Sequence, residues 1–356
     1  MRSPLLAGVL VSVALAASAD AAPAATTVIG RSPSPDIAGQ ISVAAHRGVS
    51  AFTVERSGRF SFRVVTGTGT EVPAVRSFAA APALDMGPGP DRRVTVTYSR
   101  CAEPREGPAM GGRSCRVYRY TPGRGERRVR LRLPKGTSAV LPSIWGARIA
   151  VVTYRDADTS KAPDLNSAPF GPPTRIGVYS VRTGRLLRVL PGGPRKRIPA
   201  ISLSGRVVTK TMATAGVPTG LDLREDRVAY TWRYRSSGNG PVSTRAYVAS
   251  AHHRRLILRE NDVTETCWAS IVGPLVTARG ATVGSLSCSP GIYALDRGAA
   301  KATITRPIDD LERRARAVAL EANGDSTFAI AALGGDPICP VLSGMGSFCI
   351  MRRTAK

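Results

Sequence analysis

The chain is poor in the side chains from which most catalytic sites are built. It has only three histidines, His46, His252 and His253, and aromatic residues make up 5% of its 356 residues. A nucleophilic site needs a base that a third group orients, and neither a Gly-x-Ser-x-Gly elbow nor a glycine-rich phosphate loop is present. The sequence therefore indicates no catalytic residue, no cofactor and no metal site. The scarcity of aromatics also gives no specific indication of nucleic acid binding.

Acidic residues are scarce as well. The chain has 25 Asp plus Glu against 50 Lys plus Arg, which gives a net charge of +25. Such an excess attracts anionic polymers, for example cell-wall phosphates, acidic polysaccharide or nucleic acid. The arginines are nevertheless scattered, and their densest clusters, at 124–132, 195–197 and 313–316, are modest. A high-GC genome, which the abundance of arginine and alanine indicates, would produce the same excess, so both interpretations stay open.

Apolar runs are short everywhere except at the first residues. Arg2, the apolar run 5–17 and the small residues 19–22 have the form of a secretory signal. The run is shorter than the roughly 20 apolar residues that a membrane-spanning helix needs. We therefore predict a cleaved signal peptide at 1–22, a flexible leader at 23–39 and a folded domain at 40–356 without a transmembrane segment. The mature protein is expected to be a monomer in the extracellular space or the cell envelope.

The cysteines fit an oxidising compartment. There are six, at Cys101, Cys115, Cys267, Cys288, Cys339 and Cys349. The first and last pairs flank connections between expected neighbouring strands, and the middle pair flanks another strand region. Six cysteines allow many pairings, but we predict sequential pairing because each disulfide then closes one local loop. No C-x-x-C spacing or nearby histidine supports a zinc site.

A strand–turn–strand unit recurs along the chain. In two copies the apolar runs lie at 148–154, 175–184 and 186–190, and at 227–234, 245–250 and 255–258. Helix signals are nearly absent; the stretch 307–320 is the one good candidate, and it reads equally as a loop leading into a strand. A unit of this size cannot bury its apolar face alone, so the repeats must pack against one another.

This pattern predicts an all-β fold, a single β-propeller whose 36 glycines and 27 prolines supply turns between short strands. We count about six blades, which begin near residues 41, 84, 141, 221, 271 and 317. The last unit offers only two clear strands, so an N-terminal strand at 27–29 or 40–43 is expected to complete it. A seventh blade would fit if the stretch 191–221 contains further strands. Within the first unit, the turn Ser57–Gly58 predicts a hairpin over 49–65.

Three segments resemble the blade-opening motif of propellers of the TolB and WD-like type, in which a serine–glycine turn precedes an apolar strand. The best is the sequence PAISLSGRVV at 199–208, and looser versions lie at 142–150 and 220–229. The segment 179–184 resembles the Asp-x-x-Thr-Gly turn that follows in such a blade. The WD dipeptide is missing, and most turns lack the usual aspartate. The resemblance covers most of 40–356 and implies a fold rather than a function, because unrelated activities share propellers.

In such a ring, Asp85 and Asp222 would lie where inner strands approach the central channel. Two carboxylates across a cleft can hydrolyse a glycosidic bond when burial tunes one of them. Nothing in the spacing of the acids selects a pair, and a hydrogen-bonding role within the fold is the simpler expectation. The acids available for such a site are Asp36, Glu55, Asp85, Asp222, Glu225, Asp226, Asp262 and Glu265.

Two other polar segments have simple interpretations. Asp156, Asp158 and Asp164 form the best oxygen-rich loop for calcium, but the glycine and closing glutamate of an EF-hand loop are missing. A solvated acidic loop is therefore favoured. The pair His252–His253 precedes two arginines and is typical of a solvated basic turn.

Three functional hypotheses follow. The leading one is an exported, non-enzymatic propeller that binds a protein or an anionic cell-envelope polymer through loops on one rim. The alternative is an extracellular hydrolase or lyase, which requires two carboxylates, or a carboxylate with His46, to converge on one pocket at the channel mouth. The third is a purely structural module, which predicts charge spread over both rims and no cleft.

Overall fold

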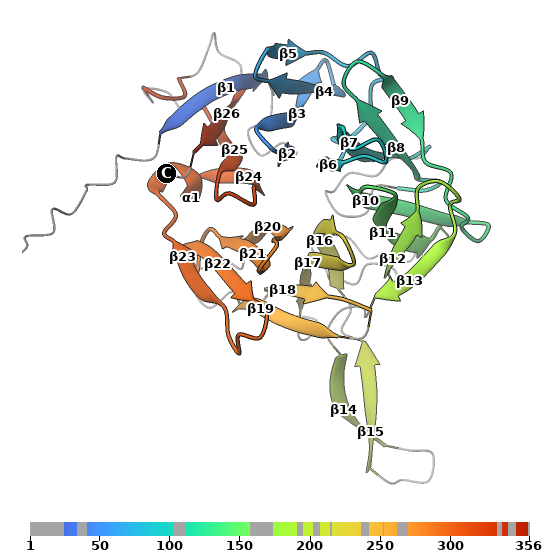
Figure 1. Cartoon of the computed structure of the whole chain (residues 1–356). Helices are drawn as coiled ribbons and strands as arrows, with labels where there is room; N and C mark the ends of the chain where they lie inside the picture. The colour runs from blue at the N-terminus through green and yellow to red at the C-terminus, as the bar shows by residue number, and fades with distance from the viewer. Residues whose placement is uncertain are drawn as a thin grey trace, which may run out of the picture.

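Six four-stranded antiparallel sheets surround a central channel in the computed structural model of the chain (Figure 1). The structure describes residues 25–33, 41–102, 112–156, 174–190, 195–201, 207–213, 216–235, 242–251, 253–261, 270–332, 337–340 and 347–354. The predicted signal peptide at 1–22 lies outside these residues. No helix in the described part is long and apolar enough to cross a membrane.

The first five blades each use four consecutive strands. Blade 1 contains β2 (Val43–His46), β3 (Val49–Arg56), β4 (Arg59–Thr66) and β5 (Gly69–Glu71). Blade 2 contains β6 (Asp85–Pro88), β7 (Val94–Arg100), β8 (Arg116–Thr121) and β9 (Gly125–Arg128). Blade 3 contains β10 (Thr137–Trp145), β11 (Arg148–Arg155), β12 (Arg175–Ser180) and β13 (Leu186–Leu190). Blade 4 contains β16 (Gly216–Arg224), β17 (Arg227–Arg235), β18 (Val242–Ala249) and β19 (Arg254–Asn261). Blade 5 contains β20 (Ile271–Val276), β21 (Gly280–Ser285), β22 (Gly291–Asp296) and β23 (Thr303–Arg306).

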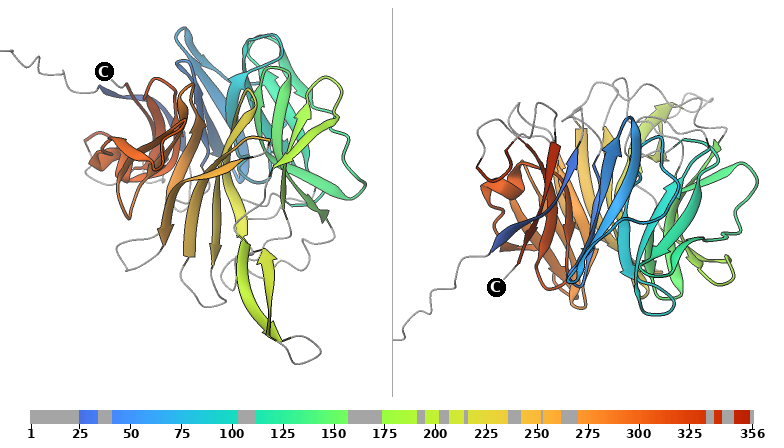
Figure 2. Two further views of the ribbon diagram at one scale, coloured as in Figure 1. Left: turned by 60° about the horizontal axis from the view of Figure 1, so that its bottom comes forward. Right: turned by 90° about the horizontal axis from the view of Figure 1, so that it is seen from above.

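In each of these blades the strand order in space follows the order in sequence. The first strand of the blade lies innermost, beside the channel, and the fourth lies at the perimeter (Figures 1 and 2). The turn between first and second strands therefore always falls at the same end of the channel, which we call the hairpin end.

Blade 6 is built from both ends of the chain. Its inner strands are β24 (Ala315–Leu320), β25 (Ser326–Ala331) and β26 (Ser347–Arg353), and its outermost strand is β1 (Thr26–Pro33). β1 pairs with β26 antiparallel along its length, which confirms that an N-terminal strand completes the last blade. Part of the stretch predicted as a flexible leader thus belongs to the ring.

The stretch between blades 3 and 4 holds two further strands but no seventh blade among the described residues. There, β14 (Arg195–Ile201) and β15 (Val207–Ala213) pair only with each other, and this hairpin extends away from the ring (Figures 1 and 2). The segment 199–208, which resembles a blade-opening motif, therefore spans the hairpin. A serine and a glycine before an apolar strand are a sequence signal that any strand pair shares, so the motif located a pair of strands and not a blade. The propeller fold is confirmed, and the TolB or WD-like assignment is not.

Two local predictions are also confirmed. Ser57 and Gly58 join β3 to β4 with φ angles of 49° and 70°, the left-handed pair that a two-residue type I′ hairpin turn requires. The stretch 307–320 gives one short helix, α1 (Asp310–Arg313), and then strand β24.

The apolar core lies between neighbouring blades. Along β11 the six residues Ile149–Tyr154 are all buried, because a blade packs on both of its faces and its middle strands have no solvent side. Blades 3 and 4 share one cluster that includes Val152, Leu223 and the fully buried Tyr230. Each sheet thus depends on its neighbours for burial, and the ring has to be closed.

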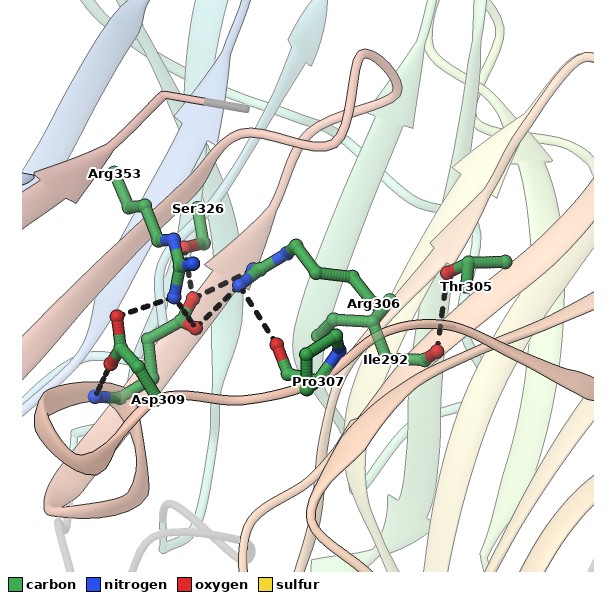
Figure 3. Close-up of polar contacts among 8 residues, drawn as sticks. Ile292, Thr305, Arg306, Pro307, Asp309, Ser326 and Arg353 are labelled. Atoms are coloured by element: carbon green, nitrogen blue, oxygen red, sulfur yellow. Dashed lines mark hydrogen bonds and ion pairs between the residues drawn. The ribbon is translucent and has the colours of Figure 1, made fainter. Parts of the chain in front are cut away.

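A buried ion network holds the closing blade in place (Figure 3). The carboxylate of Glu312, which is 1% exposed, accepts hydrogen bonds from Arg306 at 2.6 and 2.7 Å, from Arg353 at 2.9 Å and from the Ser326 hydroxyl at 2.5 Å. Arg353 also pairs with Asp309, which caps α1. Burial raises the pKa of Glu312, but the hydrogen bonds and the two cations outweigh it, and the net pKa is lowered. Because Arg353 ends β26, the network fastens the last strand to the connection between blades 5 and 6.

The neighbouring arginine joins blade 6 to blade 1. Arg352 forms ion pairs with Glu321 at 3.5 Å and with Asp325 at 3.2 Å, and it donates to the Gly48 carbonyl at 2.7 Å. The Gly48 N–H in turn donates to Glu321 at 3.0 Å. Charged groups are costly to bury unless they are paired, and here their pairing falls on the seam where the ring closes.

Two of the three predicted disulfides are confirmed. Cys101 bonds to Cys115 across the connection from β7 to β8, and Cys339 bonds to Cys349 of β26. Cys288 is also disulfide-bonded, but Cys267 lies outside the described residues and their pairing stays a prediction. Disulfides of this kind are compatible with an extracellular protein.

Candidate ligand site in the central channel

The central channel contains a cavity of about 980 Å³ to which all six blades contribute. Its volume falls within the range of small-molecule and cofactor sites, about 300–1,000 Å³. Most of the lining is apolar and comes from the inner strands. The polar and charged lining residues are Ser42, His46, Arg47, Asp85, Thr219, Asp222, Arg224, Thr231, Arg316, Glu321 and Asn323.

Irregularities in four inner strands shape the cavity wall. Each strand shifts register against the next strand of its blade: β10 near Leu141, β16 near Thr219, β20 near Gly273 and β24 near Arg316. Leu141 and Gly273 have positive φ angles of 47° and 56°, as bulged residues often do. Each irregularity lies on the cavity, so the bulges re-aim the strand residues that follow them.

Inner strands of consecutive blades are joined by hydrogen bonds from main-chain N–H groups to side chains. The N–H of Leu84 donates to Ser42 Oγ at 2.9 Å, that of Leu223 to Ser143 Oγ at 2.7 Å, and that of Val276 to Asp222 Oδ2 at 2.6 Å. Asp222 and Ser143 occupy matching places, each two residues before the end of its strand. The Asp222 carboxyl in blade 4 therefore accepts the same kind of hydrogen bond that the Ser143 hydroxyl accepts in blade 3.

Asp85 is the first residue of β6 and lies beside blade 3. Its Oδ2 atom is buried and makes no hydrogen bond to any described residue. Burial, followed by the negative charge of Asp222, raises the pKa of Asp85 well above its usual value, although Ser143 and the Ile144 main chain hydrogen-bond to the carboxyl and oppose the shift. The surroundings of Asp85 therefore favour the neutral carboxyl over the carboxylate more than water does.

The pKa of Asp222 is shifted in the same direction as that of Asp85. Burial raises the pKa of Asp222 to about 7, while the hydrogen bond from Val276 and the charge of Arg224 hold it down. Burial thus raises the pKa of both aspartates, and carboxyl groups with raised pKa values are used by acid–base catalysts.

An aromatic and cationic cluster lies at the hairpin end of the cavity. The His46 ring meets the Trp145 ring edge-on at a centroid distance of 6.0 Å, and the Arg224 guanidinium carbon lies 5.0 Å from the Trp145 centroid. Burial, followed by the charges of Arg47 and Arg224, lowers the pKa of His46 to about 4. His46 is therefore neutral at pH 7, and its buried Nε2 makes no hydrogen bond within the described part of the chain. We call His46, Arg47, Trp145 and Arg224 the mouth cluster.

The structure thus brings three of the sequence candidates to one cavity: His46, Asp85 and Asp222. Glu225 and Asp226 lie instead on the exposed turn after β16, and Glu55 lies in β3 and does not line the cavity. Asp36, Asp262 and Glu265 lie outside the described residues.

The proposed calcium loop is described only at its first carboxylate. Asp156 accepts hydrogen bonds from the Ser138 hydroxyl at 2.5 Å and from the Ser114 N–H at 3.3 Å, while Asp158 and Asp164 lie outside the described residues. His253 is exposed, and His252 is outside the described part of the chain. Among the described residues, no group of three or more His, Cys, Asp or Glu side chains is placed to hold a metal ion.

Sequence reasoning missed Trp145 and Arg224. Each is the last residue of its inner strand and immediately precedes a two-residue turn, as His46 does in blade 1. Aligning the repeats on these turns would have placed the three side chains at one end of the channel.

No protein-family model matches the chain, and no curated protein matches it. Several solved structures do. The uncomplexed acylaminoacyl peptidase of Pyrococcus horikoshii aligns with a TM-score of 0.39 and 8% identity over 81% of this chain and 48% of that one. A triple arginine-to-alanine mutant of AofleA from Arthrobotrys oligospora gives 0.42 and 10%, over 86% and 82%. The endo-arabinase of Bacteroides thetaiotaomicron gives 0.35 and 10%, over 74% and 90%.

At these identities the likeness concerns the fold alone. This chain spans about half the length of the peptidase, and none of these proteins' activities carries over to it. The chain is a six-bladed β-propeller whose function has to be inferred from its own residues.

Proposed function

We propose that this protein is an exported propeller that binds a partner at the hairpin end of its channel and catalyses no reaction. The partner we favour is an anionic polymer of the cell envelope, and a protein with an acidic surface is the other candidate. The observation that carries the proposal is the mouth cluster, in which Arg224 lies over the Trp145 ring and Arg47 follows His46 at the hairpin end of the cavity.

The chemistry of the mouth cluster fits a negatively charged group attached to a flat or apolar body. Arg47 is exposed, and among the described residues Arg224 has only Glu225 as an ion-pair partner, at 4.0 Å. The neutral His46 adds a polar group with an unused nitrogen, and Trp145 adds an aromatic surface. Cations gathered at one end of a cleft concentrate counter-ions of the opposite sign there.

The overall positive charge does not by itself single out a rim. Exposed arginines stand at the hairpin end, for example Arg92 and Arg279, and also at the opposite end, for example Arg56, Arg155 and Arg175. Such a distribution fits a compositional origin for much of the charge. The proposal therefore depends on the mouth cluster, where cations meet a cavity, and not on net charge.

Retention on a column of acidic polysaccharide tests the proposal. The double variant Arg47→Gln/Arg224→Gln should elute at clearly lower salt than the wild type, since it loses the two cations at the mouth. The matched control is Arg92→Gln/Arg93→Gln, which removes the same charge from exposed residues of the turn between β6 and β7, outside the cavity. Equal shifts for both variants would show binding through general charge and would contradict the proposal.

The second candidate function is a hydrolase or lyase in the channel. It is favoured by one observation: Asp85 and Asp222 line the same cavity with raised pKa values. Against it, the hydrogen bond of Asp222 to the next blade serves the same purpose as that of Ser143. The test is to incubate the protein with acidic polysaccharides and follow new chain ends. Cleavage that Asp85→Asn and Asp222→Asn each abolish, with folding intact, would establish the enzyme and refute the binding-only proposal.

A further inference from the structure

Strand β13, the outermost strand of blade 3, exposes an unusual amount of apolar surface. Of its five residues, Leu186, Leu187 and Val189 are 48%, 53% and 49% exposed. In the described part of the chain β13 pairs only with β12, and it lies at the perimeter of the ring (Figure 1). An unpaired, apolar edge strand offers main-chain hydrogen-bonding groups to another strand.

The other perimeter strands do not share this property. β19, β23 and β1 each carry one large exposed apolar residue, and these are Leu256, Ile304 and Val28. β5 and β9, whose residues are all described, carry none. The apolar edge is therefore specific to blade 3 and is not a general feature of the outer surface.

The charged residues of β13 and of the turn before it are all arginines. The exposed Arg182 and Arg185 precede the strand, and Arg188 lies within it. The sequence contains no acidic residue between Asp164 and Asp222, a stretch that includes blade 3 from β12 onward and the β14–β15 hairpin. Arg188 donates to the Asp226 main-chain carbonyl of blade 4, so Asp226 is an acid near this edge. A partner would otherwise meet the positive charge of these arginines.

We propose that β13 is an edge-strand docking site for an extended segment of another protein in which apolar and acidic residues alternate. The segment adds a fifth strand to blade 3, and its main chain pairs with the free edge of β13. Its apolar side chains cover Leu187 and Val189, and its acidic side chains lie near Arg185 and Arg188. Main-chain bonds supply affinity in such complexes, and the side chains supply specificity.

A second copy of this chain fits the edge less well. Pairing two β13 strands would bring their arginines together, and like charges placed opposite each other in a sheet are destabilising. The net charge of +25 on each copy adds to the repulsion. The site lies on the perimeter, away from the mouth cluster, so this inference is independent of the proposed channel function.

The probe is a fluorescent peptide of about ten alternating valine and glutamate residues, a length that spans β13 with room to spare, and its binding to the full-length protein is followed by anisotropy at low salt. A second peptide has the same side chains with N-methyl groups on alternate residues, which removes the donors needed for strand pairing. The test variant is Leu187→Thr/Val189→Thr, and the control is Leu256→Thr/Ile304→Thr on two other perimeter strands. All four residues are exposed, so the fold should tolerate the changes.

We expect the valine–glutamate peptide to bind, the N-methylated peptide to fail, and the test variant to weaken binding about tenfold or more through lost apolar contact. The control variant and Arg47→Gln/Arg224→Gln should bind like the wild type. Equal binding of the N-methylated peptide, an equal loss in the control, or no binding to the wild type would overturn the proposal. So would a dimer of the unliganded protein, seen by sedimentation, that only the test variant loses, because the edge would then belong to a second copy.

Discussion

The ion network around Glu312 should make a large and pH-dependent contribution to the stability of the ring. Glu312→Gln keeps the shape of the side chain but removes its charge, and it leaves the guanidinium groups of Arg306 and Arg353 without their shared carboxylate. Their side chains are 18% and 15% exposed, and that of Glu312 is 2% exposed. Breaking a buried ion pair from one side costs about 3–5 kcal/mol. We therefore expect the free energy of unfolding to fall by about that amount, since several charge-assisted hydrogen bonds to the carboxylate are involved.

The sign of the pH dependence follows from the lowered pKa of Glu312. On acidification the unfolded chain takes up the proton first, near pH ~4.3, so the stabilisation is complete above that pH and is lost as the pH falls through the lower folded value. Urea unfolding with disulfides intact gives the free energy of unfolding of the wild type and of Glu312→Gln. The difference between them should be large at pH 7 and should become smaller below about pH 4. The control Glu225→Gln removes a 56% exposed acid and should cost less than about 1 kcal/mol. A loss of free energy of unfolding in Glu312→Gln that is no larger than in the control, or that does not change with pH, would refute the reasoning.

Three further predictions concern the disulfides, the channel and a contact between blades. Peptide mapping without reduction should join Cys101 to Cys115, Cys339 to Cys349 and Cys267 to Cys288, and a long-range link would refute local pairing; Cys339→Ser/Cys349→Ser should cost about 3 kcal/mol for a separation of 10 residues. The pKa of Asp222 is raised to about 7, so its ionisation lowers the stability of the folded protein as the pH rises from about 4 to 7. The urea midpoint of Asp222→Asn should therefore change less over this pH range than that of the wild type. Equal pH dependence of the two midpoints would contradict the raised pKa. A Cβ atom at Gly87 would lie 2.1 Å from the Ile144 carbonyl oxygen, so Gly87→Ala should destabilise by about 1–3 kcal/mol, whereas Gly67→Ala, which meets no atom within 4 Å, should have little effect.

The fold was predictable because its signals are local. Short apolar runs, turn residues such as Ser57–Gly58 and the recurrence of the unit all lie in the sequence itself. The position of the segment 199–208 outside the ring was not predictable in the same way, because a hairpin inside a blade and a hairpin outside the ring have the same local sequence pattern. Which of the two forms depends on whether neighbouring blades leave room for it, and that is decided by contacts distant in sequence.

The site was predictable only in part. Asp85 and Asp222 could be picked out from the sequence because they are charged residues on otherwise apolar inner strands. Trp145 and Arg224 could not be picked out, since each looks like an ordinary residue before a turn. Their meeting with His46 depends on the ring bringing blades 1, 3 and 4 to one axis. No spacing along the chain encodes that distance.

The pairing of β1 with β26 has a consequence for how the molecule is made. Among the described strands, β1 is synthesised first and finds its partner only after β26, the last of them, has been added; Thr26 then lies opposite Arg353. Until then blade 6 has no outer strand, and β1 is an unpaired strand that other chains could capture. Contacts between residues so distant in sequence also form slowly. The step that completes the ring is therefore also the step at which the newly made chain is most exposed to error.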